Sequence, residues 1–474
     1  MTAETQAAAA QRLVLTESGI YALVDVSQQI VTLLTLPVFF FFLSVEDFGV
    51  ITGAVVVSQL TMFLSTVGLD FSLLRSYYVW PEEERVRLTS GIFLVTALWS
   101  LAIALLSVWV IDALSDSRTY RLPLILGAWS GLILGVRNVP LSVMRVRGMM
   151  RTYAGAEIGA AIGRGASQLV LVALGLGSVG YMVGYAVAPA LSLLALLLTA
   201  RSWLDWRHAR WMLPRDLWLY TAKVLPSLIF TRFLAIVDRA ILFKWSNLDS
   251  LGLYGAASRF SSSLKLFTGG FKMAIAPALS RTEADRAASA EVYSRLSRLL
   301  LLTMLCTGSA LMLAAWCVQF TPWAASWVQM QRLVGVLLLA QFLGGIALIR
   351  QMGTYYSPRP HTASLAAGGS AVVLVAALFL MVPHYGAMGA AAAQIAGAAV
   401  NIVLLGALDT RGSEQGGQSW EFLWLTALFV PAIAAMWLVD GRYQLFVLLP
   451  TLAVYGAITA STVIRLWLPK PVPL

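Results

Sequence analysis

The sequence has few charged residues and no long polar stretch. Asp, Glu, Lys and Arg make up 12% of its 474 residues, whereas about a quarter is usual in soluble domains. Apolar residues make up 59%, and the mean hydropathy is +0.78. This composition excludes an ordinary soluble domain and predicts an integral membrane protein.

The motifs of common enzymes are also missing. The three histidines, His208, His361 and His384, fall in separate predicted loops, so they form no metal site and no catalytic triad. No G-x-x-x-x-G-K-[ST] motif is present, and "GLGSVG" at 175–180 lacks the strand and helix of a dinucleotide site. We therefore expect no catalytic residue, no metal, no cofactor and no enzymatic activity.

Cysteine is scarce: Cys306 and Cys317 are the only two cysteines in the sequence. They lie eleven positions apart on one predicted helix, which separates them by roughly 16 Å and excludes a disulfide. Residues 1–15 contain no apolar core of a signal peptide, so no cleaved leader is expected.

Apolar runs long enough to cross a bilayer recur along the chain. They predict an all-α polytopic membrane protein with about 14 transmembrane helices, although twelve or thirteen remain open. The predicted spans are 20–43, 49–70, 91–111, 122–142, 154–174, 178–199, 218–243, 251–273, 296–319, 331–352, 362–382, 386–406, 422–438 and 443–464.

The net charge of +10 does not indicate a nucleic-acid partner, because the basic residues follow the membrane topology. With the N-terminus inside, most arginines, Arg137 and Arg145 among them, fall in predicted cytoplasmic segments. This asymmetry is the positive-inside rule, and it predicts a multi-pass protein with both termini in the cytoplasm.

A weak internal repeat divides the chain. "FLSVEDFGVITGAVVVSQL" resembles "KWSNLDSLGLYGAASRFSSSL" when Gly49 is aligned with Gly252, and "GSVG" from Gly177 matches "GAMG" from Gly386. Two parallel six-helix repeats follow from this pattern. We predict an N-terminal lobe (1–200), a cytoplasmic linker (201–217), a C-terminal lobe (218–407) and a peripheral segment with two spans and a cytoplasmic tail (408–474).

Ionisable residues inside the spans are the candidates for function, because each costs at least about 2.5–3.5 kcal/mol at a helix centre. Several recur at spacings that return to one helix face: Tyr21, Asp25, Gln28, Thr32 and Thr35; Glu157 and Arg164; Arg232 and Arg239; Lys265 and Lys272. We expect these faces to line one shared wet cavity. Its predicted bases are Arg164, Arg232, Arg239, Arg259, Lys265 and Lys272, and its predicted acids are Asp25, Asp70, Glu157 and Asp238.

The excess of bases over acids favours an anionic substrate, and a pyrophosphate suits it because a guanidinium binds two phosphate oxygens at once. Three alternatives stay open. Single pairs such as Asp238–Arg239 are equally well read as structural ion pairs, and Arg259, Lys272 and Asp70 lie near span ends, where long side chains reach the interface. The chain as a whole is alternatively an exporter of drugs or small metabolites, or a membrane scaffold without transport activity.

Three stretches resemble a known family. "LTLPVFFFFLSVEDFGVI" with "GLDFSLLRSYY", "VDRAILFKWSNLDSLGLYGAASR" and "VPHYGAMGAAAAQIAGAAV" are similar to signatures of the Wzx-type polysaccharide flippases. These belong to the multidrug/oligosaccharidyl-lipid/polysaccharide (MOP) exporter superfamily. The N-terminal pattern of the lipid II flippases is not apparent, which makes that relative an alternative.

The resemblance implies two six-helix lobes in a V that open alternately to either side of the bacterial inner membrane. It implies a cationic cavity for the head group of an undecaprenyl-pyrophosphate-linked oligosaccharide, with Asp238, Arg239 and Arg259 at matching positions. It also implies membrane lipid, a polysaccharide polymerase and glycosyltransferases as partners, in assembly of O-antigen, capsule or exopolysaccharide.

Overall fold

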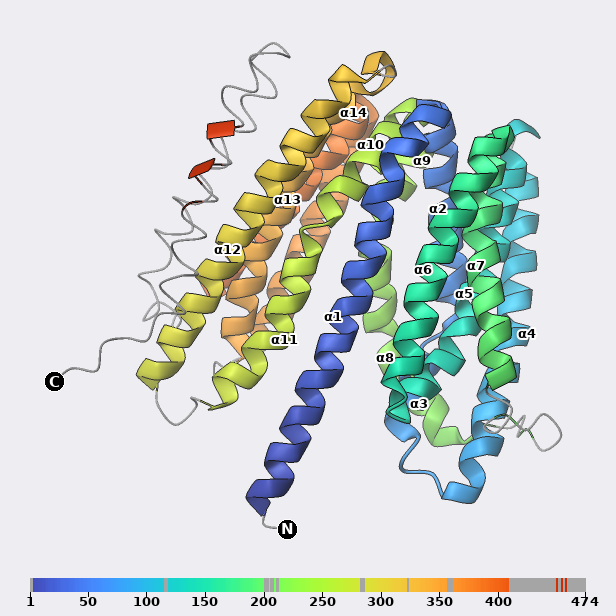
Figure 1. Ribbon diagram of the computed structural model, residues 1–474, viewed down its shortest axis with the longest axis vertical. Coiled ribbons are helices and arrows are strands. Elements are labelled where there is room, and N and C mark those ends of the chain that lie inside the picture. The colour runs from blue at the N-terminus through green and yellow to red at the C-terminus, as the bar shows by residue number, and fades with distance from the viewer. Residues whose placement is uncertain are drawn as a thin grey trace. The chain divides into compact units, whose positions relative to one another are not determined.

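A computed structural model describes residues 3–114, 118–199, 204, 209, 213–281, 286–321, 324–355 and 361–408, with five further positions between 449 and 457. All the regular elements in these ranges are helices (Figure 1). The chain forms two compact units, Met1–Phe243 and Lys244–Leu474. The lobe boundaries expected from the repeat remain predictions.

In its described residues the first unit holds eight α-helices and most of a ninth. They are α1 (Ala3–Phe42), α2 (Val45–Thr66), α3 (Leu69–Ser76), α4 (Glu82–Leu114), α5 (Arg118–Val146), α6 (Met150–Leu171), α7 (Gly177–Thr199), α8 (Arg215–Leu234) and α9 (Val237–Trp245). A π-helical turn, η1 (Val172–Leu176), joins α6 to α7.

The second unit continues from the end of α9. Its helices are α10 (Leu248–Ser262), α11 (Lys265–Arg281), α12 (Arg286–Cys317), the 3-10 turn η3 (Val318–Phe320), α13 (Ala324–Tyr355) and α14 (His361–Leu408). Cys306 and Cys317 are both free, as their spacing predicted.

Eight stretches of the described residues are long and apolar enough to cross a membrane. Two of them, Met150–Thr199 and Thr362–Leu408, are 50 and 47 residues long, about twice what one crossing needs, and each bends near its middle. The all-α polytopic membrane fold is therefore confirmed. The two C-terminal spans predicted at 422–438 and 443–464 lie outside the described residues.

The internal repeat is visible in the way α2 and α10 begin. Ser44 caps α2 and its hydroxyl accepts a hydrogen bond from the Asp47 amide, while Asn247 caps α10 and its carbonyl oxygen accepts one from the Ser250 amide. Both caps have extended backbones (φ −71° and −82°, ψ 164° and 162°). Each lies five residues before the glycine on which the two halves align.

The second match of the repeat is a sharp bend. Gly177 between α6 and α7 has φ 52° and ψ −137°, and Gly386 within α14 has φ 53° and ψ −128°. Only glycine adopts this backbone readily, because a Cβ would be strained. The same bend therefore turns the chain back at corresponding places in the two halves.

The prediction of a single helix is wrong for two of the spans, because each is divided into two helices. The span 218–243 is divided into α8 and α9 at Ala235–Ile236, and the span 251–273 into α10 and α11 at Ser263–Leu264. At the first break the Ala235 amide bonds to the Arg232 and Phe233 carbonyls, so the last turn tightens before the chain restarts.

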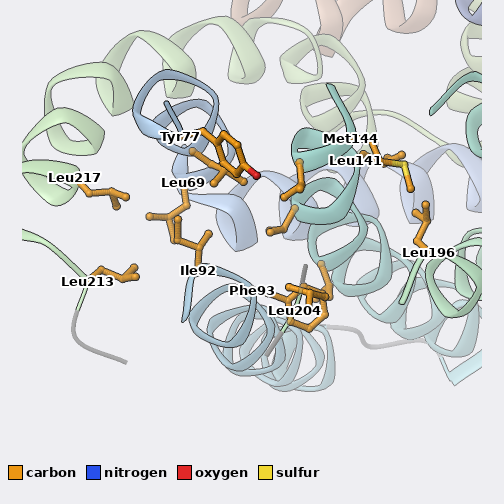
Figure 2. Close-up of a cluster of buried hydrophobic side chains, with 14 residues drawn as sticks. Leu69, Tyr77, Ile92, Phe93, Leu141, Met144, Leu196, Leu204, Leu213 and Leu217 are labelled. Atoms are coloured by element: carbon orange, nitrogen blue, oxygen red, sulfur yellow. The ribbon is translucent and has the colours of Figure 1, made fainter. Parts of the chain in front are cut away.

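One apolar core joins several helices of the first unit (Figure 2). Leu69 and Leu73 of α3 pack in it together with Met144 of α5 and Leu217 of α8. The further members are Tyr77, Ile92, Phe93, Val136, Val139, Leu141, Val143, Leu196, Leu204 and Leu213. This cluster packs α3, α5 and α8 against one another.

Candidate functional site

The polar face predicted on the first span meets α6. Gln28 donates a hydrogen bond from Nε2 to Oε2 of Glu157 (3.0 Å), and the rings of Tyr21 and Tyr153 stack edge to face, 5.4 Å apart. At Gly165 a Cβ would lie only 2.7 Å from Val31 Cγ1. The absence of a side chain at Gly165 thus lets α1 and α6 approach closely along this polar seam.

Glu157 is also one half of a buried ion pair. Its Oε1 lies 2.8 Å from Nη1 of Arg137, whose side chain is 4% exposed, against 13% for Glu157. Arg137 further donates to the Ala156 carbonyl (3.1 Å) and to Ser192 Oγ (3.0 Å). Through these bonds one network connects α1, α5, α6 and α7.

The sequence interpretation missed this role of Arg137, which it assigned to a cytoplasmic segment. The structure places Arg137 within the apolar stretch Tyr120–Val146, whose helix α5 continues past the predicted end at residue 142. Arg145 was also assigned to a cytoplasmic segment, and it too lies inside this apolar stretch, near its end. A signal was available, since Arg137 precedes the predicted end of the span by five residues.

Two further predicted residues border this network. Asp25 is exposed on α1, close enough to Glu157 for the two carboxylates to repel each other. Arg164 is half-buried on α6, and its guanidinium lies 4.9 Å from the centre of the Tyr185 ring on α7. The structure therefore brings Asp25 and Glu157 together, whereas Arg164 is directed to α7.

Asp70 lies in the first turn of α3, against α5 and α8. Arg145 of α5 and Arg232 of α8 are the two charged groups that act on its carboxylate. Its Oδ1 is buried and makes no hydrogen bond. Burial raises the pKa of Asp70 above its usual range, and bonds from backbone amides and the two arginines offset part of this rise.

Contacts between α3 and α8 bring Asp70 and Arg232 to the same region of the first unit. The hydroxyl oxygens of Ser72 and Thr221 are 2.6 Å apart, and the Arg75 guanidinium lies 4.1 Å from the centre of the Tyr220 ring. At Gly68 a Cβ would lie 3.0 Å from Leu228 Cδ1. Figure 1 shows the two helices side by side at one end of the first unit.

Arg232 and Arg239 do not share one continuous helix. Arg232 is exposed in the last turn of α8, and Arg239 is half-buried in α9 beyond the break. Asp238 is 5% exposed and accepts a hydrogen bond from the Arg239 amide (2.8 Å). A carboxylate in the first turn of α9 also stabilises that helix through its dipole.

The remaining predicted bases belong to the second unit. Arg259 is half-buried in the last turn of α10, and Lys265 and Lys272 are exposed on α11. The seven-residue spacing of the two lysines lies within one helix, but the break at Ser263–Leu264 separates them from Arg259 on α10. Among the described residues, no group of three metal-binding side chains is found.

The helical spans and the ion-paired polar network of the described residues define a polytopic α-helical membrane protein with charged groups buried in its first unit. The chain belongs to the polysaccharide biosynthesis protein family, whose profile matches residues 14–283.

Several solved membrane proteins share the fold of this chain. A lipid II flippase, MurJ, in an inward closed conformation has a TM-score of 0.69 at 13% identity, covering 94% of this chain and 100% of its own. An inward-facing multidrug resistance MATE family transporter of the MOP superfamily has a TM-score of 0.55 at 13% identity, with 91% and 96% covered. A point mutant of the Vibrio cholerae MATE transporter VcmN has a TM-score of 0.52 at 13% identity, covering 89% of this chain and 97% of its own. No curated protein matches the chain in sequence.

Proposed function

We propose that the chain is a flippase that moves an undecaprenyl-pyrophosphate-linked oligosaccharide repeat unit across the bacterial inner membrane. The observation that carries this proposal is the Gln28–Glu157–Arg137 network, which places ionised groups among apolar helices. Charges at that depth are costly and commonly mark a hydrated substrate or ion path. Membership in a polysaccharide biosynthesis family supplies the glycan, in O-antigen, capsule or exopolysaccharide assembly.

In this proposal the pyrophosphate is bound by the predicted bases of both halves: Arg164, Arg232, Arg239, Arg259, Lys265 and Lys272. Guanidinium groups suit it because they bind two phosphate oxygens in one plane. Glu157 pairs with Arg137, and the acids Asp25, Asp70 and Asp238 would balance these bases or couple transport to an ion gradient. The lipid tail stays in the bilayer while the head group crosses.

The lobes at 1–200 and 218–407 would provide alternating access, with 201–217 as the cytoplasmic linker, 408–474 as peripheral spans and tail, and both termini in the cytoplasm. A polysaccharide polymerase and glycosyltransferases would be the partners on either side of the transport step. Lipid II, the substrate in the name of the similar MurJ structure, is an alternative cargo with the same pyrophosphate chemistry.

The proposal is tested by export of lipid-linked glycan from cells that depend on this chain. Replacing Arg232 and Arg239 together by Ala should lower export at least tenfold while the amount of folded protein in the membrane stays the same. Arg295→Ala, which removes an exposed arginine paired with Glu291, is the matched control and should leave export unchanged. Export that survives the double substitution contradicts the cavity assignment.

Export of small organic molecules is the second candidate, because MATE transporters share the fold. The charge count disfavours cationic drugs, since six bases face four acids in the predicted cavity. Efflux of a cationic dye that depends on this chain, without glycan export, would favour this candidate.

A further inference from the structure

Three charged residues from different helices meet where α3 packs against α5 and α8. We propose that Asp70, Arg145 and Arg232 form a subsite for a pyrophosphate group, and that Asp70 occupies the anion position when the ligand is absent. This inference rests on the proposed function and refines it, because it adds Arg145 and assigns Asp70 a role as an internal competitor of the ligand.

The position of the cluster is fixed by the apolar core beneath it. Asp70 follows Leu69, and Arg145 follows Met144, and both of these neighbours are buried in the cluster of Figure 2. Leu217 anchors α8 in the same core. The backbones that carry Asp70 and Arg145 are thus held rigidly, as a binding site requires.

The charges of the cluster do not satisfy one another. Asp70 Oδ1 and Arg145 Nε are both buried, and neither makes a hydrogen bond. Arg145 is instead held by Ser142, which accepts a hydrogen bond from Nη2 (3.3 Å), and by the Tyr153 ring at 5.5 Å. Buried polar atoms are normally paired, so two buried atoms without a hydrogen-bond partner in one cluster call for an explanation.

An anion with several oxygens would supply the acceptor that the Arg145 Nε–H lacks. Two guanidinium groups act on the single carboxylate, so the cluster carries one excess positive charge. A pyrophosphate entering beside Arg145 and Arg232 would accept from both, whereas Asp70 would then be repelled.

A pyrophosphate carried by a lipid fits better than a free one. Phe233, next to Arg232, ends an open apolar groove of about 460 Å³ along α8, lined by Ala222, Leu225, Pro226, Ile229, Phe230 and Phe233. A hydrocarbon chain attached to a phosphate at Arg232 would lie against this face.

The test measures binding of inorganic pyrophosphate and of farnesyl pyrophosphate to the purified full-length protein in detergent, by calorimetry. Arg145→Gln and Arg232→Gln should each weaken binding about tenfold, whereas Asp70→Asn should tighten it several-fold because the competing carboxylate is gone. Farnesyl pyrophosphate should bind more tightly than inorganic pyrophosphate. Asp112→Asn, which removes an exposed carboxylate paired with Arg121, is the matched control and should change nothing.

Weaker binding in Asp70→Asn, or unchanged binding in all three variants, overturns the subsite. Equal affinities for the two ligands overturn the lipid assignment. Failure of the proposed function looks different. In that case wild-type protein in vesicles moves no lipid-linked glycan, whatever the three substitutions do to pyrophosphate binding.

Discussion

Arg137 and Glu157 form a buried ion pair between α5 and α6, with Nη1 and Oε1 2.8 Å apart. The pair is supported on three sides, because Arg137 also bonds to Ala156 and Ser192, and Glu157 accepts from Gln28 of α1. Its hydrogen bonds compensate the loss of hydration that burial imposes on both charges. Removing one partner therefore leaves the other charge buried without this compensation.

We expect Glu157→Ala to lower the free energy of unfolding by about 3–5 kcal/mol, since it leaves the Arg137 guanidinium buried without a counter-charge. Glu291→Ala breaks the exposed Glu291–Arg295 pair of α12 and should cost about 0–1 kcal/mol. Unfolding of the purified proteins in mixed micelles compares the two. Equal losses would show that the Arg137–Glu157 pair is not buried in the folded protein.

The pH dependence of stability should change in Asp70→Asn. Burial raises the pKa of Asp70, so its carboxyl binds a proton more tightly in the folded state than in the unfolded chain. In the unfolded chain the pKa of an aspartate is about 3.9. The contribution of Asp70 to stability is thus complete below that unfolded pKa and is lost as pH rises through the folded one.

At neutral pH the asparagine variant should consequently be as stable as the wild type or more stable, with a smaller decline in melting temperature between pH 4 and pH 7. Thermal unfolding at both pH values measures this difference. A variant that is destabilised at pH 7 would mean that the two arginines outweigh burial and lower the pKa of Asp70.

The overall fold was largely predictable, whereas the site was so only in part. Hydropathy and turn residues are local signals, so the helical spans and both repeated motifs, at Gly49/Gly252 and Gly177/Gly386, appear in the sequence. The break at Ala235–Ile236 has no glycine or proline to mark it. The pairing of Arg137 with Glu157 depends on how α5 packs on α6, and spacing along a single helix carries no information about that.

A disulfide should form between α3 and α8 when Ser72 and Thr221 are both replaced by Cys. Their hydroxyl oxygens are 2.6 Å apart, which brings the two Cβ atoms within reach of a disulfide. Cys306→Ser and Cys317→Ser provide a cysteine-free background, since the chain has no other cysteine. Mass spectrometry after mild oxidation measures the cross-link.

The matched control for this cross-link pairs Ser72→Cys with Leu219→Cys. Leu219 is 48% exposed and two residues from Thr221, which turns it to another face of the helix. It should remain reduced. If α8 separates from α3 during the proposed transport cycle, oxidation of the first pair should also stop transport, and a reductant should restore it.

Gly386→Ala should destabilise the second unit because of the bend within α14. The backbone there has φ 53° and ψ −128°, and a Cβ would lie 3.2 Å from both Ser246 Oγ and Ser250 Oγ at the start of α10. A side chain in this region of φ and ψ costs of order 1–3 kcal/mol.

Gly344→Ala is the matched control, because it lies within α13 and its Cβ would meet nothing within 4 Å. It should raise stability by up to about 1 kcal/mol through helix propensity. Opposite shifts of melting temperature in the two variants are expected, and an unchanged Gly386→Ala would show that the bend tolerates ordinary residues.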